Sequence, residues 1–195
     1  MKIAIDVDDV LADFNNHFAQ FINTHFGYSV SSQEFFSFRY EESLGCTTKK
    51  AYEMVDTFFA SPDFAEIAPL IGAVEGVEEL KKHHELIVIT ARQERIAQET
   101  LDFLTRHFGV FYSEVVFTGQ SREPESRKTK AQACKERGVD YLIEDHFDYA
   151  KQCADLGIKV LMIDVPWNQH AKELPPEIRR VTGWQEIVAI LNSAQ

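Results

Sequence analysis

The chain opens with Met1-Lys2-Ile3-Ala4-Ile5-Asp6-Val7-Asp8-Asp9-Val10-Leu11-Ala12-Asp13-Phe14, a short apolar run that ends abruptly in carboxylates. Residues 3–5 are apolar and partly β-branched, which is typical of a strand buried on both faces. Side chains two positions apart in a strand point the same way, so we expect Asp6 and Asp8 to converge just past the strand end. Open α/β sheets keep their active sites at that edge.

Two carboxylates this close repel each other by about 4 kcal/mol at an effective dielectric of ~20. The pair therefore needs a cation, a shared proton or both. The alternative is a solvated turn that merely carries surface acids, and the rest of the chain argues against it.

Composition predicts one globular domain with room for a small insertion, because the 195 residues are 45% hydrophobic and 26% charged. The net charge of −11 disfavours a nucleic-acid polymer or an anionic membrane as partner. No export signal or bilayer-length apolar stretch is apparent. Cys46, Cys134 and Cys153 lack metal-type spacing, so we expect reduced thiols and a cytoplasmic location.

Apolar strands alternate with helices along most of the chain. The predicted strands are residues 3–5, 86–89, 115–117, 141–143 and 159–163. The helices predicted between and after them are residues 72–84, a long helix closed by Gly109, and residues 129–137, 148–156 and 184–191, with a loop at 120–127. This alternation predicts an α/β fold, a doubly wound parallel sheet with right-handed crossovers.

Residues 14–69 show helical patterns and no strand pattern. Apolar residues recur with a helical period up to Phe26, a short aromatic helix is predicted at 33–38, and Thr47 or Thr48 can cap a helix at 49–60. We therefore expect a catalytic core of residues 1–13 and 70–195, with a small helical cap, residues 14–69, inserted after the first strand.

Polar residues end four of the five predicted strands, and in a parallel sheet these ends share one edge. They are Asp6 and Asp8, Thr90, Thr118, and Glu144 with Asp145, while Lys130 begins the helix before the fourth strand. Such a set suits phosphoryl transfer: one carboxylate attacks phosphorus and a second acid moves the proton. A hydroxyl, an ammonium and a helix N-terminus hold the phosphate oxygens, and Mg²⁺ suits the crowded oxygen ligands.

The order of these residues resembles the four motifs of the haloacid dehalogenase superfamily phosphatases, over nearly the whole chain. Further segments resemble its deoxyribonucleotidase (5′-nucleotidase) branch. They are Asp8-x-Val10-Leu11-Ala12-Asp13-Phe14, Ser61-Pro62-Asp63-Phe64 before Ile71-Gly72-Ala73, Lys130 four residues before Cys134, and Pro166-Trp167-Asn168. The resemblance implies a magnesium-dependent phosphatase of nucleoside monophosphates, acting through an aspartyl-phosphate, with a helical cap.

Carried over by position, the resemblance implies that Asp6 is the nucleophile and Asp8 the general acid/base. The implied metal ligands are the Asp6 carboxylate, the Asp8 backbone carbonyl and Asp145. Thr90 and Lys130 match the phosphate-binding positions. Spacing to Cys134 favours Lys130 over Lys128.

Further residues are expected near the phosphate site and the acid pair. Ala91 and Asp9 are expected beside the phosphate, although Asp9 stands where most relatives have Gly and adds charge and bulk. Glu144 is a candidate second acid and replaces the more usual Asp. His146 adjoins the acid pair without an expected metal role. Arg39 is expected in solvent more than on phosphate.

Phe14, Phe38 and Phe59 approximately match the base-stacking positions of the nucleotidases. Stacking on an aromatic side chain is worth about 1–3 kcal/mol per base. The alternative is that these residues build the core of a small cap. A homodimer is a possible assembly that the sequence does not decide.

Two other functions use a similar set of residues. A phosphatase of a sugar or other small phosphomonoester would share the catalytic residues and differ in the cap. A phospho-accepting signalling domain would also use acids, a hydroxyl and a lysine, but it needs neither Asp8 nor the insertion. Dehalogenase chemistry is disfavoured because Asp8 and a Mg²⁺ site would serve no purpose there.

Overall fold

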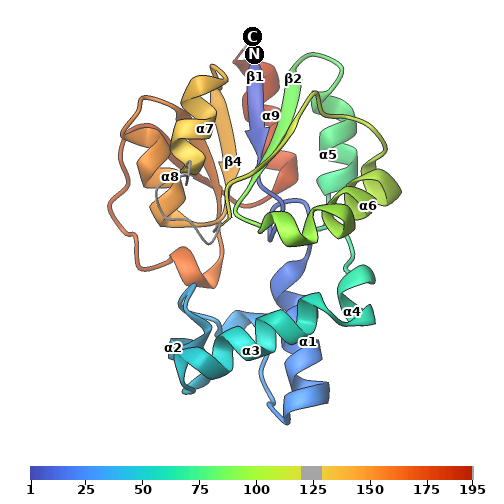
Figure 1. Cartoon of the computed structure of the whole chain (residues 1–195). Coiled ribbons are helices and arrows are strands. Elements are labelled where there is room, and N and C mark those ends of the chain that lie inside the picture. Colours follow the sequence, from blue (N-terminus) through green and yellow to red (C-terminus); the bar gives the residue numbers. More distant parts are fainter. Residues whose placement is uncertain (120–128, 195) are drawn as a thin grey trace.

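A single parallel sheet runs through the computed structural model, which describes residues 1–119 and 129–194. Its six strands lie in the order β3-β2-β1-β4-β5-β6 (Figure 1). They are β1 (Lys2–Ile5), β2 (Glu85–Thr90), β3 (Val115–Phe117), β4 (Tyr141–Glu144), β5 (Lys159–Ile163) and β6 (Ile178–Val181). The predicted doubly wound α/β fold is confirmed. The predicted loop at 120–127 and Lys128 lie outside the described residues.

The strand order reverses between β1 and β4, and this reversal marks where a ligand crevice is expected at the carboxyl edge of the sheet. In the observed register Ile5 pairs with Val88 of β2 and with Ile143 of β4. The carboxyl ends of these three strands therefore lie side by side. In open α/β sheets the crevice for ligands forms outside the strand ends at this reversal.

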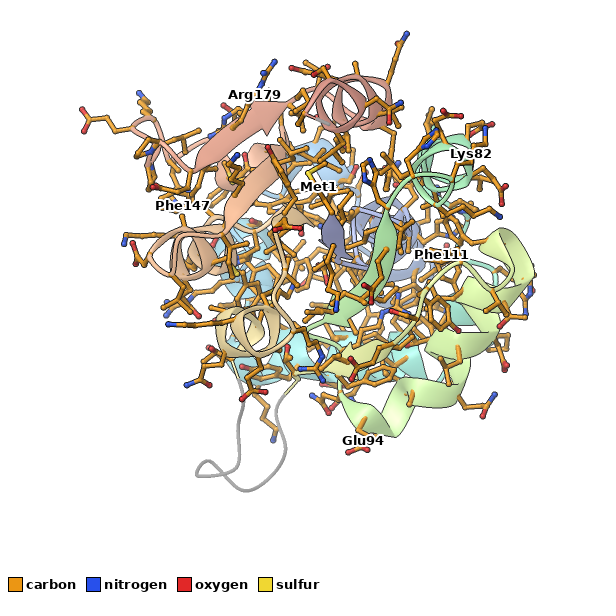
Figure 2. The ribbon with its side chains drawn as sticks, turned by 90° about the horizontal axis from the view of Figure 1, so that it is seen from above. Met1, Lys82, Glu94, Phe111, Phe147 and Arg179 are labelled. Atoms are coloured by element: carbon orange, nitrogen blue, oxygen red, sulfur yellow. The ribbon has the colours of Figure 1, made fainter. Side chains whose placement is uncertain are left out.

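Alternate residues of β1 face two separate cores. Ile3 and Ile5 belong to the larger core, and Ala4 belongs to the smaller one. The larger core is covered by α5 (Ala73–Leu80), α6 (Ala97–Phe108) and α9 (Trp184–Ser193), and the smaller one by α7 (Lys130–Glu136) and α8 (Phe147–Ala154). Viewed from above, Phe147 and Lys82 lie on opposite sides of the sheet (Figure 2).

Strand β6 is absent from the sequence-based prediction. Its two central residues are Arg179 and Arg180, and only Ile178 and Val181 are buried. An edge strand pairs on one side only and can carry charged side chains, so it lacks the apolar run that marks the other strands.

Trp184 at the start of α9 fixes the loop that follows β1. Its indole N–H donates to the Val10 carbonyl at 2.8 Å. A Cβ on Gly76 of α5 would lie 2.3 Å from the indole ring. The close approach of α5 to α9 therefore requires glycine at position 76. This close packing holds the Trp184 ring against the loop.

The segment predicted as the cap lies beyond the carboxyl edge of the sheet, at the opposite end from the two termini (Figure 1). Its helices are α1 (Phe14–Phe26), α2 (Tyr40–Leu44), α3 (Thr48–Phe59) and α4 (Pro62–Ala65), with a 3₁₀ turn at Ser32–Glu34. Thr47 caps α3 by accepting from the Lys50 N–H. The two connections to the core run side by side, since Asp13 N donates to Ala68 O (2.9 Å) and Leu70 N to Leu11 O (2.8 Å).

The predicted helix at 33–38 is wrong. Ser31 and Glu34 form a capping box around the short 3₁₀ turn, and Phe35 is extended. The Ser43 hydroxyl then accepts from the N–H groups of Phe36 and Ser37, so a side chain replaces the helical carbonyls. Within residues 1–119 and 129–194, none of the helices has both the length and the apolar character that a bilayer crossing requires.

Candidate active site

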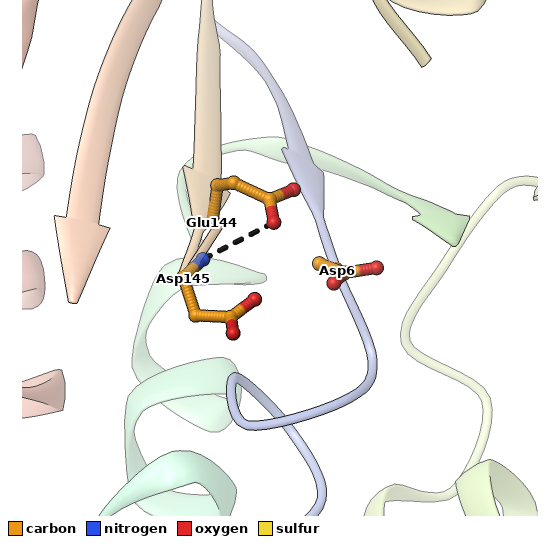
Figure 3. A group of neighbouring side chains, drawn as sticks. All are labelled: Asp6, Glu144 and Asp145. Carbon is orange, nitrogen blue, oxygen red and sulfur yellow. Dashed lines mark hydrogen bonds between the residues drawn. The ribbon is translucent and has the colours of Figure 1, made fainter. Parts of the chain in front are cut away.

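Three buried carboxylates meet at the ends of β1 and β4. Asp6 directly follows β1, Glu144 is the last residue of β4, and Asp145 comes next (Figure 3). Oxygens from the three side chains lie within 4.8 Å of one another. Strand geometry thus brings together acids that are more than 130 positions apart in the sequence.

Lys130 is the cation that the described residues bring to this cluster. It is the first residue of α7, and its Nζ lies 2.6 Å from a Glu144 oxygen and 3.0 Å from Asp6 Oδ1, with the side chain wholly buried. Burial alone lowers the pKa of the ammonium, but the adjacent carboxylates of Asp6 and Glu144 outweigh burial and raise that pKa. Lys130 therefore stays charged.

The remaining negative charge is not balanced within the cluster. Burial raises the pKa of Asp6 to about 7, with Lys130 opposing the shift and Glu144 and Asp8 adding to it. Burial, with Glu144, also raises the pKa of Asp145 well above its usual range. Asp6 Oδ1 is buried, and among the described residues it has the ion pair with Lys130 and no further hydrogen bond.

The negative charge of these three carboxylates exceeds the single positive charge of Lys130. The cluster therefore fits a divalent cation, since Mg²⁺ prefers carboxylate and carbonyl oxygens as ligands.

Backbone and side-chain donors fix the two acids that end β4. The indole N–H of Trp167 donates to Asp145 Oδ2 at 2.7 Å. Asn168 donates to the Asp145 carbonyl, also at 2.7 Å. Glu144 accepts from the N–H groups of Asp145 (3.2 Å) and His146 (3.0 Å). In the sequence, only the family resemblance points to Trp167 and Asn168, since no spacing rule links them to the acid pair.

Thr90 ends β2 and is buried at the same edge as Asp6. Its hydroxyl accepts from the Arg92 N–H (3.1 Å), and its carbonyl accepts from the N–H and hydroxyl of Thr118. A Cβ on Gly119 would lie 2.3 Å from the carbonyl oxygens of Ala91 and Arg92. Glycine is therefore required where the end of β3 closes over the Thr90 turn, a role that sequence analysis missed.

Asp8 does not join the carboxylate cluster. It lies near enough to add to the raised pKa of Asp6, but its carboxylate forms an ion pair with Arg92 at 2.7 Å. The strand ends at Ile5, so the alternation that predicted convergence of Asp6 and Asp8 does not extend to Asp8. No sequence pattern assigned a role to Arg92, which lies 84 positions from Asp8.

Asp9 turns away toward the cap. Its backbone has φ of 54°, a left-handed conformation that Asp tolerates better than most residues. Its buried carboxylate accepts from the Asn15 N–H at 3.0 Å, at the N-terminus of α1. Burial raises the pKa of Asp9, and the Asn15 hydrogen bond opposes that shift. The side chain thus takes up a free N–H of the first helical turn.

The three aromatic residues proposed for stacking lie in different surroundings. Phe14 is buried against Phe18 and Phe58 inside the cap. Phe59 is half-buried and packs on Phe14 and Phe64. Phe38 is 53% exposed.

Phe38 borders a cleft of about 550 Å³ between the α2 end of the cap and the core, close to Trp167. Its ring meets His146 edge-on, with the centroids 4.2 Å apart. The cleft is lined by Phe36, Ser37, Phe38, Arg39, Glu42, His146, Phe147, Asp148, Trp167 and His170. Arg39 pairs with Glu42 at 3.2 Å and is largely exposed.

Comparison with known proteins gives consistent matches over the full length. The model of the family described as "5' nucleotidase, deoxy (Pyrimidine), cytosolic type C protein" matches residues 1–195. The "Putative nucleotidase YqfW" of Bacillus subtilis is 25% identical over 194 residues, covering 99% of this chain and 94% of its own.

Solved structures share the fold. A haloacid dehalogenase-like family hydrolase from Streptococcus pneumoniae has a TM-score of 0.68 at 18% identity, over 97% of both chains. The "putative HAD-hydrolase YfnB" of Bacillus subtilis, solved bound to magnesium, has a TM-score of 0.64 at 13% identity, over 98% of both chains.

Proposed function

The chain belongs to the 5′ nucleotidase, deoxy (pyrimidine), cytosolic type C family and is a phosphoric monoester hydrolase of the haloacid dehalogenase superfamily; from this premise we propose that it hydrolyses nucleoside monophosphates. The observation that carries the proposal is the buried cluster of Asp6, Glu144, Asp145 and Lys130 at the strand-order reversal. We propose residues 1–13 and 70–195 as the catalytic core and residues 14–69 as the cap that selects the substrate.

The proposed reaction has two displacements on phosphorus. The Asp6 carboxylate attacks the phosphorus and forms an aspartyl-phosphate while the alcohol leaves with a proton from Asp8. Asp8 then takes a proton from water, which attacks the phosphorus, releases inorganic phosphate and restores Asp6. Lys130 and Thr90 hold the phosphoryl oxygens, at the edge of the sheet where both lie.

Magnesium is the proposed cofactor, held by the carboxylates of Asp6 and Asp145 and the backbone carbonyl of Asp8. When bound, it neutralises charge on the acids and on the phosphoryl oxygens. Glu144 is the second acid of the pair, and it already engages Lys130 at 2.6 Å. We therefore assign Glu144 to holding Lys130 and Asp145 to holding the metal.

The cleft beside Trp167 is the proposed place for the leaving nucleoside. It is bordered by Phe38 and His146, and its volume of about 550 Å³ lies within the range of small-molecule sites. Of the three aromatic residues, Phe38 is the exposed one. We propose that Phe38 stacks on the base, while Phe14 and Phe59 support the cap beneath it.

We expect a panel of phosphate esters with Mg²⁺ to show the highest kcat/KM for a nucleoside monophosphate. Phe38→Ala should lower kcat/KM for that nucleotide by about 5- to 150-fold, equivalent to a stack of ~1–3 kcal/mol. Hydrolysis of p-nitrophenyl phosphate should change little. Tyr52→Ala, at another exposed cap aromatic outside the cleft, is the matched control. A wild type that prefers a sugar phosphate would contradict the nucleotide assignment. Equal losses on both esters would show that Phe38 supports the cap and does not stack on the base.

The two acids at the end of β4 should respond differently to magnesium. We expect Asp145→Asn to raise the Mg²⁺ concentration for half-maximal activity by at least about 10-fold, since it weakens a metal ligand. Glu144→Gln should lower kcat through Lys130 and shift the Mg²⁺ requirement less. The measurement is a Mg²⁺ titration of kcat from chelated enzyme; full activity in excess chelator would refute the metal site.

A further inference from the structure

The Arg92 guanidinium is buried between the loop that follows β1, the core and the cap. It lies just after β2, its side chain is only 2% exposed, and it is the cation that faces Asp8. Its Nη1 donates to the Thr100 hydroxyl of α6 at 3.1 Å. The ring of Phe64 in α4 covers it, with Cζ 5.1 Å from the ring centroid.

The contacts between Arg92 and Asp8 leave one acceptor position open. Nε donates to both carboxylate oxygens at 3.2 Å, and Nη2 donates to Oδ1 at 2.7 Å. Each carboxylate oxygen accepts about two hydrogen bonds. Counting the hydrogen bonds from residues 1–119 and 129–194, Oδ1 is therefore filled, whereas Oδ2 keeps one free position.

We propose that Arg92 is a positioning residue that holds Asp8 so that Oδ2 faces the leaving group, and that Phe64 of the cap fixes Arg92 in that orientation. This inference rests on the proposed function, in which Asp8 moves the proton. The Asp8 side chain is 30% exposed, and without the guanidinium fork it is free to rotate into solvent. A planar fork defines both the distance and the plane of the carboxylate, which an ammonium does not.

The arrangement ties proton transfer to the cap. Phe64 comes from the segment that we assign to substrate selection. Arg106 of α6 donates to the carbonyl of the neighbouring Ala65 at 2.7 Å. A cavity of about 70 Å³ lies at this junction, lined by both arginines and by Phe64. A shift of α4 therefore changes the surroundings of Arg92 directly.

The test compares esters that differ in their need for an acid. The substrates are the most active alkyl phosphate of the panel above and p-nitrophenyl phosphate, whose phenolate leaves without a proton. We expect Arg92→Met to lower kcat on the alkyl ester by about 100-fold, the scale for a reacting group displaced by ~1 Å. The aryl ester should lose under about 3-fold in the phosphorylation step, with KM changed less than kcat for both.

Two further variants separate geometry from charge and packing. Arg92→Lys keeps the charge without the fork, so it should fall between wild type and Arg92→Met. Phe64→Leu keeps apolar volume without the ring face and should show the same leaving-group pattern, at about 3- to 10-fold, as a partial displacement. Arg106→Met, at the same junction but without contact to Asp8, is the matched control and should leave the ratio of the two rates unchanged.

Thermal melts of every variant show whether the fold is intact. Equal losses on both esters, or an unchanged alkyl rate in Arg92→Met, would overturn the positioning role while leaving the phosphatase assignment in place. A wild type inactive on both esters would instead overturn the proposed function, and this inference with it.

Discussion

Replacing Asp6 with Asn should reduce turnover by roughly 10⁴-fold or more, the scale seen when a covalent nucleophile is removed. The amide keeps the shape of the carboxylate but lacks the negative oxygen that attacks phosphorus. The measurement is kcat with Mg²⁺ and the best substrate of the panel, in protein free of wild-type contamination. Retention of a tenth of the wild-type rate would rule out Asp6 as nucleophile.

The same variant should not weaken the fold. The pKa of Asp6 is raised by burial from 3.8 to about 7, so the folded state binds this proton more tightly than the unfolded chain does. Ionising Asp6 in the folded state therefore lowers the free energy of unfolding. This loss is absent below pH 3.8, grows as the pH rises, and reaches its full size above about pH 7.

In chelator, Asp6→Asn should melt at or above the wild-type temperature at pH 8, with a smaller difference at pH 5. A variant that is both inactive and unstable at pH 8 would point to a structural role.

The core of the site was predictable because its signals are local. The strand before Asp6, the strand before Glu144 and Asp145, and the helix that starts at Lys130 are each visible as short patterns. A parallel sheet brings such strand ends to one edge whatever their distance in sequence. The observed order of β2, β1 and β4 then sets these residues next to one another.

The rest depended on contacts that leave no local pattern. Arg92 pairs with Asp8 from 84 positions away, and Trp167 reaches Asp145 from the loop after β5. Asp9 was expected near phosphate, but its side chain bonds to the start of α1 because the loop turns there with a positive φ. Side-chain direction in an irregular loop follows from tertiary packing, which strand alternation does not describe.

Removing the ammonium of Lys130 should give the largest loss of stability among the site variants. Its Nζ lies between Asp6 and Glu144 at 3.0 and 2.6 Å, and all three side chains are almost fully buried. Taking away one partner of a buried ion pair leaves an uncompensated charge and costs about 3–5 kcal/mol. We expect Lys130→Met to lower the free energy of unfolding by that amount in urea titrations at pH 8 with chelator.

Two comparisons show whether the loss comes from buried charge. Lys151→Met removes an exposed ion pair, in which Nζ lies 2.7 Å from Asp155 with both side chains about half exposed, and should cost under about 1 kcal/mol. Lys130→Met combined with Glu144→Gln should be more stable than Lys130→Met alone, because the second change removes one stranded carboxylate.

Acid should reduce the loss in Lys130→Met, since Asp6 takes up a proton below its raised pKa of about 7. A loss equal to that of Lys151→Met, or one that does not depend on pH, would show that Lys130 does not hold the two acids together. Its role would then be confined to the phosphate, and the stability of the site would have to come from the donors around Asp145.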